Sequence, residues 1–202
     1  MKRTAIHYLL LALLAVGFLG CKKDYGNQLG PLQDSVAAIP VTVTNQVYFE
    51  RFPIVTTTVT GTGSTSSGTF SIDFSIPADK GKIKEITKVA TGNSGVEYLQ
   101  SALYPNYLTK TVTGTGTNTI TFSSDLNAVR DYVARLNAAF ATLPATATKT
   151  PAFAFTGTST GGAGTLTPNA NPQTPNQLRF FFLITLEDGT QLITTEVDVR
   201  LL

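Results

Sequence analysis

The C-terminal stretch Leu178-Arg-Phe-Phe-Phe-Leu-Ile-Thr-Leu186-Glu-Asp-Gly-Thr-Gln191-Leu-Ile-Thr-Thr-Glu-Val-Asp-Val-Arg-Leu201 decides the fold. An aromatic and aliphatic run is followed by an Asp-Gly pair and then by a second run rich in β-branched residues. Asp-Gly between two such runs is the strongest short-range signal for a β-hairpin. The stretch therefore predicts two adjacent antiparallel strands.

A register follows if Asp188 and Gly189 are the two central residues of the turn. Ile184 then faces Ile193 and Phe180 faces Val197, with Phe182 on the same face. On the opposite face Arg179 meets Asp198, and Phe181 meets Glu196. Apolar residues pair with apolar residues and opposite charges meet, so the register is self-consistent.

Further strands are predicted upstream by β-branched and aromatic residues in alternation. The clearest alternates Phe70, Ile72, Phe74 and Ile76 with polar residues. The predicted strands are Pro40–Phe49, Ile54–Thr62, Phe70–Ile76, Lys82–Thr91 and Thr119–Phe122. Lys82–Thr91 alternates less cleanly, which fits either a β-bulge or a short irregular strand.

One amphipathic helix is expected after Asp125. Apolar residues recur at helical spacing from Leu126 to Leu143, Ser123, Ser124 and Asp125 offer N-caps, and Pro144 ends the segment. Arg130 and Arg135 fall off the apolar stripe. A stripe this wide in a single domain usually faces its own core, although a helix for binding a partner has the same pattern.

These elements predict a mainly β fold, a two-sheet antiparallel sandwich of seven to nine strands with immunoglobulin-like architecture and one inserted helix. An up-and-down barrel is the alternative. The sequence Thr-Val-Thr-Gly-Thr-Gly occurs at 58–63 and again at 111–116. Two copies of so simple a hexamer fit either duplication or similar hairpin turns.

The N-terminus has the three regions of a secretory signal. Lys2 and Arg3 precede an apolar run, Leu9–Leu19, which ends at Gly20-Cys21. The run is too short for a stable membrane-spanning helix. The expected organisation is a signal peptide over 1–20, a tether over 21–39 and a single β domain over 40–202.

Gly20-Cys21 at the end of the apolar run resembles the lipobox of bacterial lipoproteins, with Phe18 departing from the usual pattern. The resemblance implies that Cys21 is lipidated and becomes the first mature residue. Lys22-Lys23-Asp24 resembles the tether of outer-membrane lipoproteins common in the Bacteroidota. An outer-membrane lipoprotein is therefore expected, on either the periplasmic or the surface face. The alternative is an ordinary signal peptide with an incidental cysteine. Asp34-Ser35-Val36 resembles a short O-glycosylation sequon, and plain linker is favoured there.

The mature composition excludes several functions. Removal of residues 1–20 leaves 13 basic residues against 13 acidic ones, so no nucleic-acid partner is expected. His7 is lost with the signal, and the only cysteine would carry lipid. Ser-His-Asp, Cys-His and histidine-ligated metal chemistry is therefore excluded, and no cofactor is expected.

Two functions from different classes stay open. The first is a non-catalytic lipoprotein that binds an envelope protein or a glycan. The second is a carboxylate-dependent hydrolase, which two carboxylates converging in a cleft would support. Glu187 and Asp188 are adjacent but lie at the predicted turn. Calcium at Asp79 or Asp188 is disfavoured because neither loop has the dense Asp/Asn spacing of such sites.

The candidate binding residues are Tyr98, Tyr104, Asn106 and Tyr107, in a predicted loop. Tyrosine rings stack on sugars or peptides and offer a hydroxyl. The alternative, that these rings fill the core or cover its edge, is favoured, and the absence of Trp weakens the sugar interpretation further.

Overall fold

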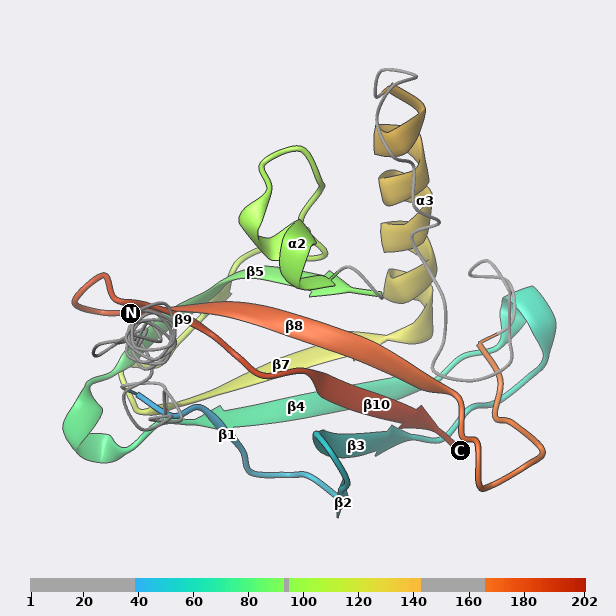
Figure 1. Ribbon diagram of the computed structural model, residues 1–202, viewed down its shortest axis with the longest axis horizontal. Coiled ribbons are helices and arrows are strands. Elements are labelled where there is room, and N and C mark those ends of the chain that lie inside the picture. Colours follow the sequence, from blue (N-terminus) through green and yellow to red (C-terminus); the bar gives the residue numbers. More distant parts are fainter. Residues whose placement is uncertain (1–38, 93–94, 143–165) are drawn as a thin grey trace, which may run out of the picture. The chain divides into compact units, whose positions relative to one another are not determined.

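The central strand of the larger sheet is β8 (Gln177–Leu186), the apolar half of the predicted hairpin (Figure 1). The computed structural model describes residues 39–92, 95–142 and 166–202. On one side β8 pairs with β5 (Ile83–Thr91), and on the other with β9 (Gln191–Ile193) and β10 (Val197–Leu201). Most of β8 is buried, as its nearly continuous apolar sequence predicts for a strand covered on both faces.

The predicted hairpin register is confirmed in one half and wrong in the other. Far from the turn, Phe180 faces Val197 and Arg179 faces Asp198, as expected. Near the turn, Ile184 faces Leu192 instead of Ile193.

The difference begins at the turn, which has three residues, Glu187 to Gly189. Leu186 and Thr190 close the loop by a 2.9 Å backbone bond, and Gly189 has a φ of +88°, which favours glycine. A longer loop shifts the pairing by one residue, and an extra residue between β9 and β10 shifts it back.

The smaller sheet has the order β1-β4-β7, with β1 (Thr42–Val43), β4 (Thr69–Ser75) and β7 (Thr119–Asp125). β4 and β7 pair along their whole length, whereas β1 covers only the end of β4 at Phe74 and Ser75. Every second side chain of β4 is buried, so the alternation predicted over Phe70–Ile76 is confirmed.

The larger sheet has the order β2-β3-β10-β8-β5-β6, with β9 beside β8. Its remaining strands are β2 (Tyr48–Phe49), β3 (Pro53–Thr57) and β6 (Val112–Thr113). Two predictions are corrected here. The expected single strand Pro40–Phe49 is two short strands, β1 and β2, in different sheets. The expected all-antiparallel pairing fails between β3 and β10, which are parallel. The described residues form ten strands, more than the seven to nine expected.

The two sheets share one hydrophobic core. Phe70, Phe74 and Phe122 of the smaller sheet contact Phe180 and Phe182 of the larger one, with ring centroids 4.7–5.8 Å apart. The described strands close no hydrogen-bonded barrel, so the barrel alternative is wrong for this part of the chain. The bulged β5 is confirmed, with register shifts after Ile83 and Ile86.

The predicted helix is α3 (Leu126–Thr142), and its apolar stripe is buried from Leu126 to Phe140, as expected. Leu143 and Pro144, the predicted end of the helix, lie outside the described residues. Asp125 is the cap, since its Oδ1 accepts the Ala128 N–H at 2.8 Å. Both arginines off the stripe hold neighbouring backbone: Arg130 donates to the Ser66 carbonyl, and Arg135 to the carbonyls of Asn106 and Tyr107. A second, short helix, α2 (Gly95–Gln100), was not predicted.

The two Thr-Val-Thr-Gly-Thr-Gly copies lead into β4 and β7, which are neighbours in the smaller sheet. Their settings differ. A Cβ at Gly114 would lie 2.1 Å from the Ile83 carbonyl oxygen, whereas one at Gly61 would lie 3.4 Å from its nearest neighbour. The same hexamer therefore packs tightly against β5 in one copy and loosely in the other.

Candidate functional site

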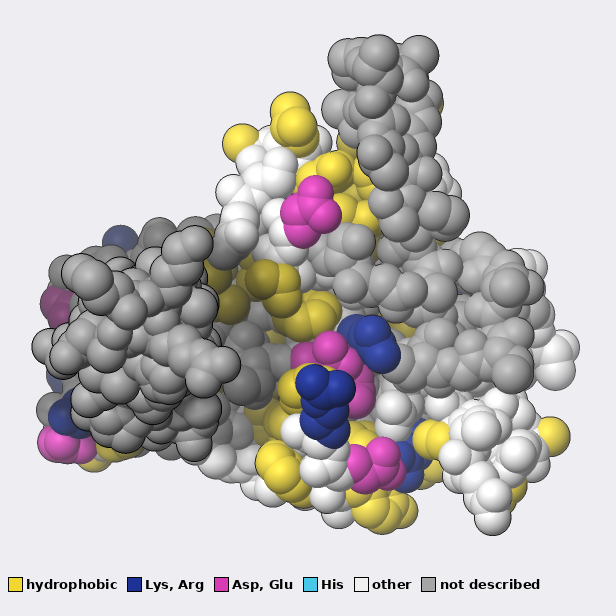
Figure 2. Space-filling model, viewed as in Figure 1, with side chains coloured by type: hydrophobic (Ala, Val, Ile, Leu, Met, Phe, Trp, Pro, Cys, Tyr) yellow, Lys and Arg dark blue, Asp and Glu magenta, His cyan; other side chains and the backbone are white. Residues whose placement is uncertain are grey.

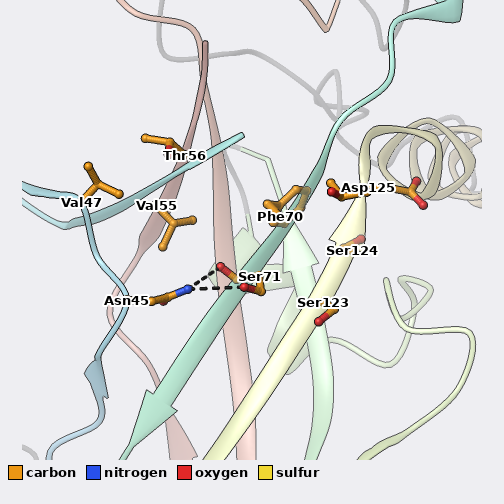
Figure 3. Close-up of a pocket in the computed structure, with 10 residues that line it drawn as sticks. Asn45, Val47, Val55, Thr56, Phe70, Ser71, Ser123, Ser124 and Asp125 are labelled. Atoms are coloured by element: carbon orange, nitrogen blue, oxygen red, sulfur yellow. Dashed lines mark hydrogen bonds between the residues drawn. The ribbon is translucent and has the colours of Figure 1, made fainter. Parts of the chain in front are cut away.

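An open groove lies where the smaller sheet meets β3 (Figure 3). Its volume is 610 Å³, within the range of ligand pockets. The lining comes from three places: the β1–β2 connection, β3, and the adjoining ends of β4 and β7. These residues are Asn45, Val47, Val55, Thr56, Thr69, Phe70, Ser71, Ser123, Ser124 and Asp125.

The groove exists because β1 is too short to cover β4. After Val43 the chain leaves the ladder, and side chains take over the edge of β4. Asn45 donates from Nδ2 to the Ser71 carbonyl at 2.9 Å (Figure 3). Its Oδ1 accepts the Asp73 N–H at 3.0 Å. Thr57 donates to the Thr69 carbonyl at 2.9 Å. Side chains therefore bond three backbone groups of the β4 edge, the carbonyls of Ser71 and Thr69 and the Asp73 N–H, where no strand lies beside it.

Hydroxyl side chains dominate the outer face of the smaller sheet, which continues from the groove. Because side chains alternate along a strand, the residues between the buried positions of β4 and β7 share this face. Ser71 lies opposite Ser123, and Asp73 lies opposite Thr121, whose hydroxyl donates to Oδ1 of Asp73 at 2.6 Å. These side chains are exposed or half-buried, and no Lys or Arg lies on β4 or β7.

The groove floor is tied to the core at the end of β7. The Ser124 and Tyr107 hydroxyls lie 2.6 Å apart. Burial is the main cause that raises the pKa of Tyr107, so this ring is a neutral partner at ordinary pH. One carboxylate oxygen of Asp125 caps α3. The floor is thus held rigidly by a strand end, a helix start and a core ring.

The predicted binding residues do not form an exposed tyrosine cluster. Tyr98 and Tyr107 are 2% and 4% exposed, and Tyr104 is half-buried against Tyr98, with centroids 4.5 Å apart. Asn106 is structural, since its carboxamide binds the backbones of Thr87, Val89 and Leu108. Tyr98 and Tyr107 are therefore core rings, as the alternative interpretation expected. The segment also contains the helix α2, where a loop was expected. A binding role for the four residues stays a prediction, with Tyr104 the most exposed ring.

A carboxyl pair lies outside the groove, on the outer face of the larger sheet. Asp198 is 6% exposed, and its Oδ1 has no hydrogen-bond partner among the described residues. Burial, and then the neighbouring charge of Glu196, raise the pKa of Asp198 to about 7 against the opposing effect of Arg179. The Arg179 Nε lies 3.2 Å from Oε1 of Glu196. Asp198 therefore lies opposite Arg179 in the strand register, as predicted. The ion pair of Arg179, however, is with Glu196.

A second charged group lies beside it on β10. Arg200 contacts Glu50 at 2.6 Å, and its guanidinium lies 4.9 Å from the Tyr48 ring centroid. Acidic and basic side chains gather over β8 and β10 in Figure 2. Neither carboxyl of the Glu196–Asp198 pair lines the groove. The carboxyl pair is therefore not part of the groove lining.

The other predicted positions are placed as follows. Asp188 accepts the Thr190 N–H at 2.9 Å, and this bond is the main cause that lowers its pKa. Asp79 lies 3.7 Å from Lys80. Within the described ranges no group of three or more His, Cys, Asp or Glu gathers, and no helix is long and apolar enough to cross a membrane. Cys21, Ser35, the signal and the tether lie outside the described residues.

Sequence reasoning missed the groove. The alternating Ser and Thr residues of β4 and β7 were visible, but nothing in the sequence indicated that β1 would be short enough to leave them open. No protein-family model, curated protein or solved structure matches the chain.

Proposed function

We propose that this chain is a lipid-anchored, non-catalytic lipoprotein of the outer membrane whose β domain binds an envelope protein or a glycan. The binding half rests on one observation, the 610 Å³ groove beside β4. Hydroxyl and amide groups dominate its lining, and neither carboxyl of the buried pair reaches it. Such a lining suits recognition through hydrogen bonds better than acid–base chemistry.

The anchor half rests on the sequence. The apolar run ending at Gly20-Cys21 resembles a lipoprotein signal, and the near-neutral mature chain has no electrostatic hold of its own on anionic lipid. Two or three acyl chains on Cys21 would anchor it stably, whereas a single chain binds only marginally.

We also propose that the architecture is an immunoglobulin-like sandwich. Two mostly antiparallel sheets with a shared aromatic core support this assignment. The parallel β3–β10 pair departs from the plainest version of it.

The anchor is tested by comparing wild type with Cys21→Ser in fractionated cells. The wild type should sediment with membranes and its intact mass should include acyl chains, whereas Cys21→Ser should be released as a folded protein. A Cys21→Ser chain that stays in the membrane pellet, or an unmodified wild-type cysteine, contradicts the anchor.

The binding role is tested by capture from envelope extracts on immobilised Cys21→Ser protein. Ser123→Arg, which fills the exposed groove floor with a large cation, should abolish capture of any specific partner. The matched control is Ser64→Arg, an exposed serine outside the groove. Equal capture by both variants contradicts the groove as the binding site.

The second candidate, a carboxylate-dependent hydrolase, is favoured by one observation, the raised pKa of Asp198 beside Glu196. A proton held near neutral pH suits a general acid. Hydrolysis of an envelope glycan that Asp198→Asn abolishes, while the variant keeps its folded stability, would establish this function instead.

A further inference from the structure

The charge of the groove restricts what it can bind. None of its lining residues is Lys, Arg or His, and its one carboxylate, Asp125, already caps α3. Phosphate, sulfate and carboxylate ligands are usually held by cationic side chains or by clustered backbone N–H groups. The groove offers no cation for an anionic ligand.

The hydroxyls of the groove are arranged for a ligand that both donates and accepts hydrogen bonds. Ser71 and Ser123 are cross-strand neighbours, and Thr69 and Asp125 are the next such pair along β4 and β7. Among the described residues, the side-chain hydroxyls of Ser123 and Thr69 have no hydrogen-bond partner. A hydroxyl is at once a donor and an acceptor, so these groups match the hydroxyls of a sugar.

An extended peptide adding a strand to β4 fits less well. Strand addition needs free backbone groups along a sheet edge. The carbonyls of Ser71 and Thr69 already accept bonds from Asn45 and Thr57, and the Asp73 N–H is bound by Asn45. A peptide strand would have to displace these side chains.

The edge strand β2 carries an exposed aromatic ring, Phe49, which lies two residues beyond the groove-lining Val47 and is not itself part of the lining. Tyr48 lies under Arg200 on the outer face of the larger sheet, so alternation puts Phe49 on the opposite face. That inner face of the β2–β3 pair also carries Val55, which lines the groove. Phe49 is 68% exposed and follows two other exposed apolar side chains, Val47 and Tyr48, so the three form a continuous apolar stretch at this edge. Such a ring can stack on the C–H face of a sugar.

We propose that the groove binds a neutral saccharide, with Ser71, Ser123 and Thr69 bonding its hydroxyls and Phe49 stacking on a ring. This assignment rests on the proposed function, since it names the ligand class of the same groove. It differs from the tyrosine site expected from the sequence, because it uses the smaller sheet and β2 in place of the segment around α2.

The test is calorimetric titration of the full-length Cys21→Ser protein with defined hexasaccharides. The neutral probes are maltohexaose, cellohexaose, xylohexaose, mannohexaose and chitohexaose, and the anionic probe is hexagalacturonate. At least one neutral probe should bind, and hexagalacturonate should not. Phe49→Ala should weaken that binding about tenfold, and Ser123→Ala about threefold, in line with the loss of one stacking contact and one hydrogen bond.

Matched controls separate the groove from general effects. Leu103→Ala removes a side chain of similar exposure, 67%, away from the groove, and Ser64→Ala removes an exposed hydroxyl. Both should bind as the parent protein does. The midpoint of urea unfolding for each variant verifies that the fold is kept.

Three results would overturn the assignment, and each has a different consequence for the proposed function. Binding of hexagalacturonate alone, weakened by Phe49→Ala, rejects a neutral ligand but keeps the groove. Neutral binding that neither groove variant changes rejects the groove itself. Absence of binding by every neutral probe at 10 mM (on the order of the weakest specific affinities) rejects the saccharide, whereas the capture experiment with Ser123→Arg still decides the binding role.

Discussion

The two sheets use their faces differently. In the larger sheet β8 is buried on both faces, because the smaller sheet covers one and α2 lies against part of the other. In the smaller sheet β4 and β7 bury one face only, and the other carries exposed hydroxyls. Stability should therefore concentrate in the larger sheet, and the open face of the smaller one is free to change without loss of the fold.

The largest effect is expected from removing an aromatic ring at the centre of the core. Phe180 is fully buried, and its ring contacts Phe70 and Tyr107 at 5.4 Å and Phe122 at 5.8 Å. Phe180→Ala should lower the free energy of unfolding by about 3–5 kcal/mol through lost burial and a cavity. Urea unfolding measures this. Ser123→Ala, on the open face, should change it by less than about 0.5 kcal/mol. Equal effects would contradict the division of stability.

The cover over the outer face of β8 is tested at Gly95. A Cβ there would lie 2.1 Å from the Phe181 ring, so α2 packs directly on this strand. Gly95→Ala should cost about 1–3 kcal/mol by overpacking, measured by thermal unfolding. Phe181→Leu should relieve much of that cost in the double variant. If Gly95→Ala is neutral, α2 does not cover β8.

The buried carboxyl of β10 makes stability depend on pH. The pKa of Asp198 is raised to about 7 in the folded chain, against an ordinary value of 3.8. Between about pH 4 and pH 7 the folded state keeps a proton that the unfolded state has lost, so this contribution to stability is complete below pH 4 and is lost as pH rises through 7. The loss from pH 5 to pH 8 should be on the order of 2 kcal/mol.

Asp198→Asn should remove that pH dependence, because the amide stays neutral throughout. Urea midpoints at pH 5 and pH 8 compare the variant with wild type. Asp79→Asn, at an exposed site, is the control and should keep the wild-type difference. The same pH dependence in Asp198→Asn and wild type would show that another group titrates.

The smallest effect compares one substitution in both sheets. Thr185 of β8 is buried, and its hydroxyl forms a hydrogen bond with that of Thr87. Thr185→Val leaves the partly buried Thr87 hydroxyl without this partner and should lower the free energy of unfolding by about 1–2 kcal/mol. Thr121→Val breaks an exposed bond to Asp73 and should cost under about 0.5 kcal/mol. Chemical unfolding of the two variants in parallel gives the difference. A larger loss at Thr121 would show that the hydroxyl face is structural.

Long elements with a strong pattern were predictable. β4, β7, β8 and α3 were expected within a few residues, because burying an apolar face dictates the spacing of its side chains. The bulges of β5 were expected from its broken alternation. Short elements were not predictable. β1 and β2 were read as one strand, since two-residue strands have too little pattern to reveal that they belong to different sheets. α2 was missed because one turn and a half of helix gives no periodicity.

The site shows the same limit. Tyr98 and Tyr107 were candidates because tyrosine suits both a core and a surface, and only burial in the folded chain separates the two. Glu196 and Asp198 were assigned to one hairpin face, and Asp198 does lie opposite Arg179, but the ion pair of Arg179 is with Glu196, two residues earlier in the chain. Two acidic side chains on one face lie within reach of the same arginine, one directly opposite and one diagonal, so pairing rules alone could not choose between them.

The sequence by itself determined the alternating apolar stripes, the aromatic core and the cap and start of α3, because each depends on residues close together in the chain. The tertiary structure alone decided that β3 pairs with β10 in parallel and that β1 ends after two residues. It also decided that Asn45 and Thr57 form hydrogen bonds to the backbone at the edge of β4. The groove follows from these three facts together. They join segments far apart in sequence, and which distant strands meet depends on how the whole chain buries its apolar surface.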